Sequence, residues 1–236
     1  MTKVHNKNCK WEQTTPEQCE YRDTHHYCPH KEHACNCAEV KKPLIFIAIP
    51  TMGYMKTELA SRLLVWTKKH AGVAHATCGV TPVDHARNEM VRTFLKSNCT
   101  HLFFVDADTI PPEDALEKLL KVDKDIASGI THIYRDGSIV NNCFVNYSED
   151  GEFSKMDTVV ENTGVVEIER CGTSCMLIKR EVFEKLGSKW FQNVWNAEYT
   201  GYVSEDLSFC DKARKEGFKL ACDTSVVCLH SKEILL

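Results

Sequence analysis

The sequence lacks the features that insert a chain into a membrane or bind it to a polyanion. No apolar run in its 236 residues is long enough to cross a bilayer, and the first residues, MTKVHNKNCKWEQ, contain no hydrophobic signal core. The formal net charge of -4 gives no general attraction to nucleic acid or to an anionic lipid surface. We therefore expect a soluble, cytoplasmic protein without a transmembrane segment.

Internal repeats and low-complexity tracts are also absent, which excludes repeat and fibrous architectures. The composition, 43% hydrophobic and 26% charged, is that of a globular protein, so a disordered chain is not expected. The length allows one large domain with a small appendage.

Cysteine, in contrast, is abundant and unevenly placed. The chain has 13 cysteines, and a group of them lies in the first forty residues beside His25, His26, His30 and His33. Without a secretory signal, reduced thiols are favoured over a disulfide framework, and thiolate and imidazole ligands suit zinc. For the Cys/His-rich segment, residues 1–42, we predict a structural zinc site drawn from Cys9, Cys19, Cys28, His30, Cys35 and Cys37. The spacing fits no standard zinc motif, so an unliganded or disordered segment, disulfides and an iron–sulfur cluster stay open.

The pattern changes after Lys42. The apolar run LIFIAIP, residues 44–50, is bounded by prolines and is typical of a strand buried on both faces of a parallel sheet. Strand-like and helix-like segments then alternate. Helices are predicted at 57–70, 84–96, 113–122, 179–186 and 204–216, and strands at 44–50, 80–82, 101–105, 125–129, 138–145, 165–169, 219–222 and 225–230. This alternation predicts an α/β domain over residues 43–236, with a mostly parallel sheet flanked by helices and an antiparallel or irregular part at 130–170.

Two aspartates follow the buried strand HLFFV directly. Asp106 and Asp108 are two residues apart, so in extended chain their carboxylates point the same way, at the edge of the sheet where ligands gather. Two oxygen ligands without a thiol or imidazole between them suit Mg²⁺ or Mn²⁺ bound jointly with substrate phosphates. The alternative is that one aspartate merely caps the helix that follows.

Five motifs follow one another in a characteristic order along residues 43–231. They are Ile49-Pro50, Ala86-Arg87-Asn88, Asp106-Ala107-Asp108, the run CGTSCMLIKREVF at 171–183, and Ser204-Glu205-Asp206 followed by CDKARKEG at 210–217. This order resembles glycosyltransferases of the GT-A (Rossmann-like) fold, most closely the large inverting family 2. The Cys/His-rich segment has no counterpart in the resemblance.

The resemblance implies a metal-dependent, inverting, hexosyltransferase-like enzyme that uses a nucleotide-diphosphate sugar, with UDP as the expected nucleotide. Its Asp-x-Asp motif would hold Mn²⁺ or Mg²⁺ against the diphosphate through Asp106, Asp108 and His230. The donor would lie against Pro50, Thr51, Arg87, Asn88, Asp106, Asp108 and Gly172. Asp84 could cap the helix that it begins or contact the uracil of the donor, and the helix cap is the more conservative interpretation.

The resemblance also assigns the chemistry of the acceptor. Asp206 would be the general base that takes the proton of the attacking hydroxyl, and Glu205 would orient the acceptor or support the site. The alternative is that both residues form the acidic first turn of a helix. Trp190 and Trp195 precede this motif and are candidates for the acceptor site, since aromatic faces suit sugars and nucleobases. The acceptor itself stays open among a saccharide, a protein side chain, a lipid-linked glycan and a modified nucleobase.

Two other functions remain to be weighed. A nucleotidyltransferase also uses paired aspartates, but it would need a glycine-rich, basic loop after the first strand, where PTMGYMK supplies one glycine. A non-catalytic, zinc-containing binding protein on a transferase scaffold is the third hypothesis. This third hypothesis is disfavoured because the residues expected to be catalytic or metal-binding are all present: Asp106, Asp108, Asp206 and His230.

Overall fold

The structure is a computed structural model of the chain, and it describes residues 2–3, 39–40, 43–70, 73–78, 81–135, 137–145, 157–196 and 201–231. Contacts divide the chain into two units, Met1–Pro43 and Leu44–Leu236. In the first unit, the described strands β1 (Thr2–Lys3) and β2 (Glu39–Val40) pair antiparallel. The predicted zinc ligands, from Cys9 to Cys37, lie outside the described residues.

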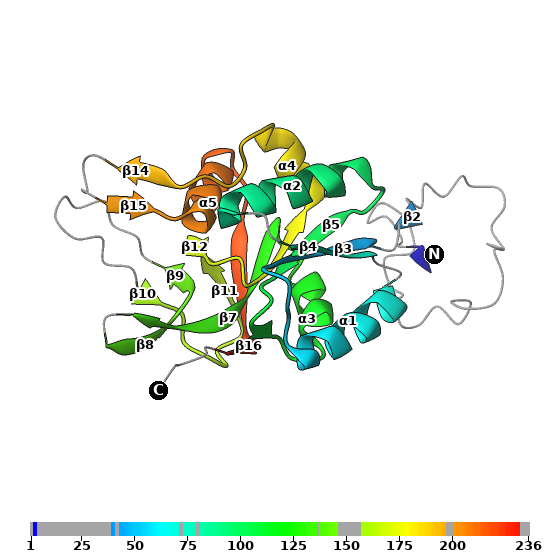
Figure 1. Ribbon diagram of the computed structural model, residues 1–236, viewed down its shortest axis with the longest axis horizontal. Helices are drawn as coiled ribbons and strands as arrows, with labels where there is room; N and C mark the ends of the chain where they lie inside the picture. Colours follow the sequence, from blue (N-terminus) through cyan, green and yellow to red (C-terminus); the bar gives the residue numbers. More distant parts are fainter. Residues whose placement is uncertain are drawn as a thin grey trace, which may run out of the picture. The chain divides into compact units, whose positions relative to one another are not determined.

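A large sheet runs through the second unit in the order β11-β16-β7-β13-β5-β3-β4 (Figure 1). The strands are β3 (Ile45–Thr51), β4 (Val73–Cys78), β5 (His101–Val105), β7 (Ile126–Arg135), β11 (Val165–Ile168), β13 (Cys175–Lys179) and β16 (Leu220–His230). Strands β16, β7, β5, β3 and β4 all point the same way, whereas β13 lies antiparallel between β7 and β5 and β11 is an antiparallel edge. The expected α/β class with a mostly parallel sheet is confirmed.

The strand predicted at residues 80–82 is wrong. The strand next to β3 is β4, Val73–Cys78, which pairs with it in parallel. Its small residues, VAHATC, give a weak hydrophobic signal because it lies at the edge of the sheet. Pro82 has no N–H to give to a strand ladder, and it stands instead at the N-cap of the following helix.

Helices cover both faces of the sheet (Figure 1). Helices α1 (Thr57–His70) and α3 (Ala115–Val122) lie on one face, and α2 (Val83–Lys96), α4 (Arg180–Leu186) and α5 (Glu205–Lys215) lie on the other. No helix among the described residues is long and apolar enough to span a bilayer.

The period of two along the buried strands divides the core into two layers. In β3, Phe46 and Ala48 join the layer under α2, α4 and α5, while Ile45, Ile47 and Ile49 join the layer under α1 and α3. Because helices cover both faces of the sheet, every residue of the run LIFIAIP, residues 44–50, is apolar. The first layer contains a stack of aromatic rings, in which Phe209 lies 4.5 Å from Phe191 and 5.7 Å from Phe183 between centroids.

The remaining strands are short and pair antiparallel, as the sequence predicts for residues 130–170. They are β6 (Thr109–Ile110), β8 (Ser138–Asn141), β9 (Cys143–Val145), β10 (Asp157–Thr158), β12 (Arg170–Cys171), β14 (Val194–Asn196) and β15 (Gly201–Val203). Strands β6 and β8 pair with the large sheet, β9, β10 and β12 form a three-stranded sheet, and β14 and β15 form a two-stranded one. The last two form a hairpin that leads directly into α5. Several cysteines are free and buried, so they act as small core residues: Cys99, Cys143, Cys171, Cys175, Cys210, Cys222 and Cys228.

Protonation of His101 should weaken the fold in acid. Burial, and then the charge of Lys179, lower the pKa of His101 from 6.5 to about 4. Between these two values the unfolded chain binds a proton that the folded chain does not, so stability is lost as the pH falls through this window. The loss is about 2 to 3 kcal/mol by pH 4.5. Urea unfolding at pH 7 and pH 4.5 should show a smaller acid loss for His101→Gln than for the native protein; equal losses would contradict this account.

Candidate active site

The carboxyl ends of β3, β5 and β7 meet at one edge of the sheet, and the turn after β5 is fastened there from two sides. The backbone N–H of Lys56, in the loop after β3, donates to the carbonyl of Ala107 at 3.1 Å. The N–H of Asp106 donates to the carbonyl of Ser174 at 3.2 Å. The two predicted carboxylates, Asp106 and Asp108, therefore stand on a turn that neighbouring loops hold in place.

Asp108 and His230 lie together at this edge. The Nε2 atom of His230 is 3.2 Å from Oδ2 of Asp108, and its Nδ1 is 2.8 Å from the carbonyl oxygen of His132. A carbonyl can only accept, so Nδ1 carries a proton and Nε2 faces the carboxylate. Such a pair suits either an imidazolium beside a carboxylate or a cation shared by Nε2 and Oδ2, because ligating histidines commonly donate their other N–H to a carbonyl.

Arg87 joins the aspartate turn to the start of α5. It is 5% exposed, and its guanidinium donates to Oδ1 of Asp106 at 3.1 Å and to the carboxylate of Glu205, itself 7% exposed. Its Nε is buried without a hydrogen-bond partner in the described part of the chain. The guanidinium thus pairs with two carboxylates of the chain, and the predicted contact of Arg87 with a donor stays a prediction.

Asp206 follows Glu205 in the first turn of α5. One carboxylate oxygen, Oδ1, accepts hydrogen bonds from the hydroxyl of Ser204 and from the N–H of Leu207, the latter at 2.8 Å. The other, Oδ2, lies toward Gly172, where an added Cβ would be 3.4 Å away. The side chain is half-buried. Its carboxylate thus has one oxygen fixed by the helix start and the other turned toward the glycine loop between β12 and β13.

A buried polar network lies behind the glycine loop, and the sequence did not predict it. Asn142 accepts from the N–H of Thr131 at 2.8 Å and donates to Oγ of Ser174 at 3.0 Å, and Ser174 donates to Oγ1 of Thr131 at 2.8 Å. A Cβ at Gly172 would stand 2.9 Å from Nδ2 of Asn142, so a side chain there would displace the network. The signal for it was Asn141-Asn142 within an apolar run, since buried amides need partners.

Asn88 and Trp190, two of the predicted ligand contacts, make hydrogen bonds within the fold. The amide of Asn88 donates to the carbonyl of Phe191 at 2.7 Å and accepts from its N–H at 3.1 Å. Trp190 is 5% exposed, and its Nε1 donates to the carbonyl of Phe183 at 2.9 Å. Both side chains fasten the segment after α4 onto the core. Contact of Asn88 with a donor and of Trp190 with an acceptor stays a prediction.

The other predicted contacts are Pro50 and Thr51 on β3 and Trp195 on β14. Pro50 and Thr51 end β3, beside the start of the aspartate turn, and Thr51 shapes the following loop by accepting from the N–H of Gly53 at 3.1 Å. Trp195 stands on β14 and is 56% exposed, with its ring centroid 4.9 Å from that of Tyr202. Their contacts with a donor or an acceptor stay predictions.

A metal ion would find a partial ligand set here. The described residues contain no group of three or more His, Cys, Asp or Glu side chains placed to hold a cation. Asp108 and His230 supply two ligand atoms, while Asp106 is paired with Arg87. This set fits Mg²⁺ or Mn²⁺, which take one or two protein carboxylates and complete their coordination with water and substrate phosphates. It does not fit a cation bound by protein alone.

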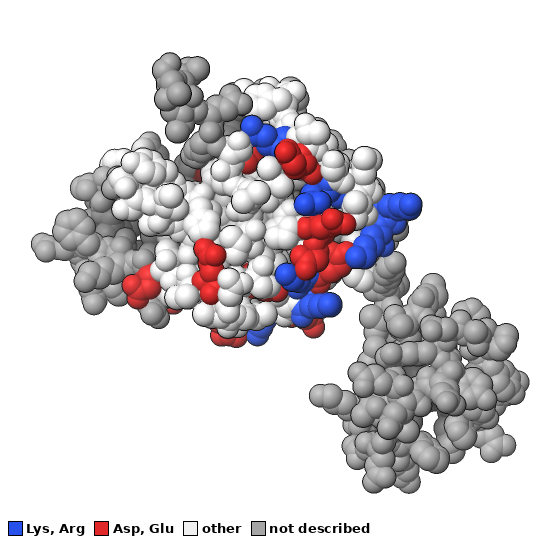
Figure 2. Space-filling model, turned by 90° about the horizontal axis from the view of Figure 1, so that it is seen from below, with Lys and Arg blue, Asp and Glu red and all other residues white. Residues whose placement is uncertain are grey.

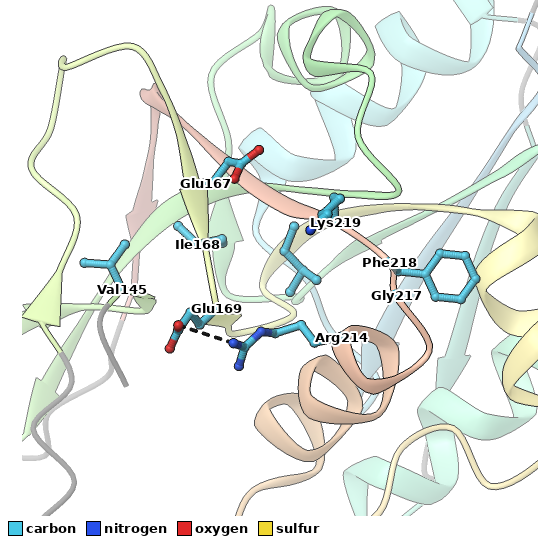
Figure 3. A pocket seen from close by; sticks show the side chains of 9 residues that line it. Val145, Glu167, Ile168, Glu169, Arg214, Gly217, Phe218 and Lys219 are labelled. Atoms are coloured by element: carbon cyan, nitrogen blue, oxygen red, sulfur yellow. Dashed lines mark ion pairs between the residues drawn. The ribbon is translucent and has the colours of Figure 1, made fainter. Parts of the chain in front are cut away.

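A hollow of about 390 Å³ lies at the other end of α5, and it contains none of the predicted site residues (Figure 3). Glu169 and Arg214 form an ion pair across it at 3.2 Å. On the face shown in Figure 2, acidic and basic side chains are interspersed. Among the described residues of that face, lysine and arginine form no continuous stripe of the kind that binds a polyanion.

Comparison with known proteins shows the fold. No protein-family model matches the sequence, and no curated protein matches it. Among solved structures, A197 from STIV is similar with a TM-score of 0.58 and 20% identity, covering 81% of this chain and 86% of that one. GalNAc-T7, crystallised with UDP, GalNAc and Mn²⁺, is similar with a TM-score of 0.50 and 12% identity, covering 84% of this chain. This chain spans 45% of the GalNAc-T7 chain. The GT-A type of fold expected from the sequence is thus confirmed.

Removing Arg87 should destabilise the protein strongly. Arg87→Met would leave Glu205 buried without its partner, and we expect the free energy of unfolding to fall by about 3 to 5 kcal/mol. Adding Glu205→Gln should recover part of the loss, since the uncompensated charge is then gone. Arg92→Met is the matched control on the same helix: its ion pair with Glu89 is exposed and is worth about 1 kcal/mol or less. Urea unfolding measures both free energies. If the two arginine variants lose equal free energy of unfolding, the buried bridge stabilises the fold no more than the exposed ion pair does.

Proposed function

We propose that the protein is a metal-dependent, inverting glycosyltransferase that moves a sugar from a nucleotide-diphosphate sugar to an acceptor hydroxyl. The observation that carries the proposal is the Arg87 bridge, which joins Asp106 to Glu205. Through it, the turn with the cation-binding Asp108 and the helix start with Asp206 belong to one site. A transferase needs both, because the leaving diphosphate and the attacking hydroxyl meet at the same carbon.

Asp108 and His230 would hold the divalent ion, with Asp106 beside them. When bound, the ion supplies Lewis acidity that stabilises the negative charge growing on the leaving nucleotide diphosphate. UDP is the proposed nucleotide, supported by the resemblance of the motifs and by the UDP and Mn²⁺ in the GalNAc-T7 crystal. The hydrogen bond from His230 to the carbonyl of His132 keeps Nε2 directed at Asp108.

Asp206 would act as the general base. Its Oδ1 is held by Ser204 and the N–H of Leu207, which leaves Oδ2 to receive the proton of the acceptor hydroxyl. Glu205 is a positioning residue in this scheme, because its carboxylate is held by Arg87 and anchors the first turn of α5. The absence of a side chain at Gly172 keeps space beside Oδ2.

The proposal is tested by incubating the purified full chain with a panel of UDP-, GDP- and dTDP-sugars. Nucleotide release is followed with Mn²⁺, with Mg²⁺ and with EDTA. Metal-dependent release from one donor is the expected result, since water can replace the acceptor. Incorporation of a nucleotide into product with release of pyrophosphate would favour the nucleotidyltransferase alternative. No release and no binding of any nucleotide diphosphate would favour the non-catalytic binding protein.

Loss of the Asp108 carboxylate should remove metal-dependent turnover. We expect Asp108→Asn to lower nucleotide release by about 100-fold at limiting Mn²⁺, with partial recovery as Mn²⁺ is raised. Asp114→Asn is the matched control, because Asp114 is exposed and pairs with Lys118 away from the site. An Asp108→Asn variant with the native Mn²⁺ dependence would refute the assignment of Asp108 as a ligand.

Replacing Asp206 should affect turnover and spare donor binding. Asp206→Asn keeps the shape of the side chain and removes its basicity, so sugar transfer should slow by about 100-fold to 10,000-fold. The affinity for UDP with Mn²⁺, measured by calorimetry, should change little. The base assignment fails if transfer continues at the native rate.

A further inference from the structure

The hairpin of β14 and β15 exposes two aromatic rings. Trp195 and Tyr202 are direct cross-strand partners, with their rings edge to face at 75°. They are 56% and 74% exposed, and the neighbouring Val194 is 41% exposed. A cross-strand aromatic pair steadies a hairpin, but that contact does not require so much of both rings to face solvent. Exposed apolar groups gathered at one place commonly mark a binding surface.

The hairpin is continuous with the proposed base. Strand β15 ends at Val203, and Ser204 then leads into the first turn of α5. Tyr202 and Asp206 are four positions apart in the chain, so their Cα atoms lie within about 14 Å of each other. A molecule resting on these rings can therefore place a hydroxyl near the carboxylate of Asp206.

The two strands of the hairpin, residues 194–196 and 201–203, carry no charged side chain, and the sequence between them, residues 197–200, has one acidic residue, Glu198, and no basic one. The residues just before the first strand are Gln192 and Asn193. The nearby amine of Lys212 is engaged by the carbonyl of Lys189 at 2.9 Å and by Oε1 of Gln192 at 3.0 Å. A nucleic acid would need lysine or arginine for its phosphates, whereas amides and aromatic faces suit an uncharged molecule with many hydroxyls.

We propose that Trp195 and Tyr202 form the acceptor platform and that the acceptor is a neutral saccharide. The inference rests on the proposed function, because an acceptor exists only for a transferase. A sugar ring laid on an aromatic face removes its apolar C–H surface from water while its hydroxyls stay free for amides or solvent. Of the acceptor classes that the sequence leaves open, the uncharged strands and exposed aromatic rings favour a saccharide over a modified nucleobase.

The test is calorimetric titration of the full chain with cellotetraose, chitotetraose, maltotetraose and mannotetraose, without donor. A single-stranded DNA and a duplex containing 5-hydroxymethylcytosine are titrated in parallel. At least one saccharide should bind, and Trp195→Ala or Tyr202→Ala should weaken that binding by about tenfold or more. Trp195→Phe should retain most of the affinity because it keeps an aromatic face. Tyr134→Ala is the matched control, since Tyr134 is another exposed cross-strand aromatic, on β7 opposite Ile139.

Three results would overturn the inference: no saccharide of the panel binds, the Tyr134 variant weakens binding as much as the Trp195 variant, or the DNA binds in place of the sugars. Tryptophan fluorescence, compared between the native protein and Trp195→Phe, gives a second readout, because among the tryptophans of the described residues Trp66 and Trp190 are buried and Trp195 is exposed. Donor hydrolysis by the native protein is measured separately. Nucleotide release without saccharide binding would leave the proposed function standing and remove this inference alone.

Discussion

The site depends on one buried guanidinium between two carboxylates. Arg87, from α2, holds Asp106 at the end of β5 and Glu205 at the start of α5, so three elements far apart in sequence are fixed at one edge of the sheet. Removing these charges from water is costly, and the pairing offsets that cost only while all partners are present. The arrangement thereby couples the folding of α5 to the geometry of the aspartate turn.

The sheet and its loops also restrain Asp206 and the turn that carries Asp106 and Asp108. Strand β13 lies between β5 and β7, and the loop before it brings Gly172 beside Asp206 and Ser174 beside the aspartate turn. The network of Asn142, Thr131 and Ser174 supports this loop from within. Polar groups held in this way keep their positions without reorganising, which is what stabilising a developing charge requires.

Much of the fold was readable from the sequence because the signals are local. The runs at 44–50 and 101–105 are buried on both faces, so their apolar character alone marks them as central strands. The weakly apolar strand β4 was missed for the converse reason. The contacts within the candidate site are harder to predict, because Asn88 and Trp190 bond to the backbone of Phe191 and Phe183, which only the tertiary structure brings to them. Residue type placed Arg87 at the site but could not show that its partners are carboxylates.

The central claim is that the sheet edge carrying Asp108 and His230 binds a nucleotide diphosphate through a divalent ion. Calorimetric titration of UDP into the full chain, with Mn²⁺ and then with EDTA, tests it most directly. The account predicts binding that requires the ion and disappears in a His230→Ala variant. Binding of UDP that is equally tight in EDTA, or no binding of UDP, GDP or dTDP with any divalent ion, would contradict it.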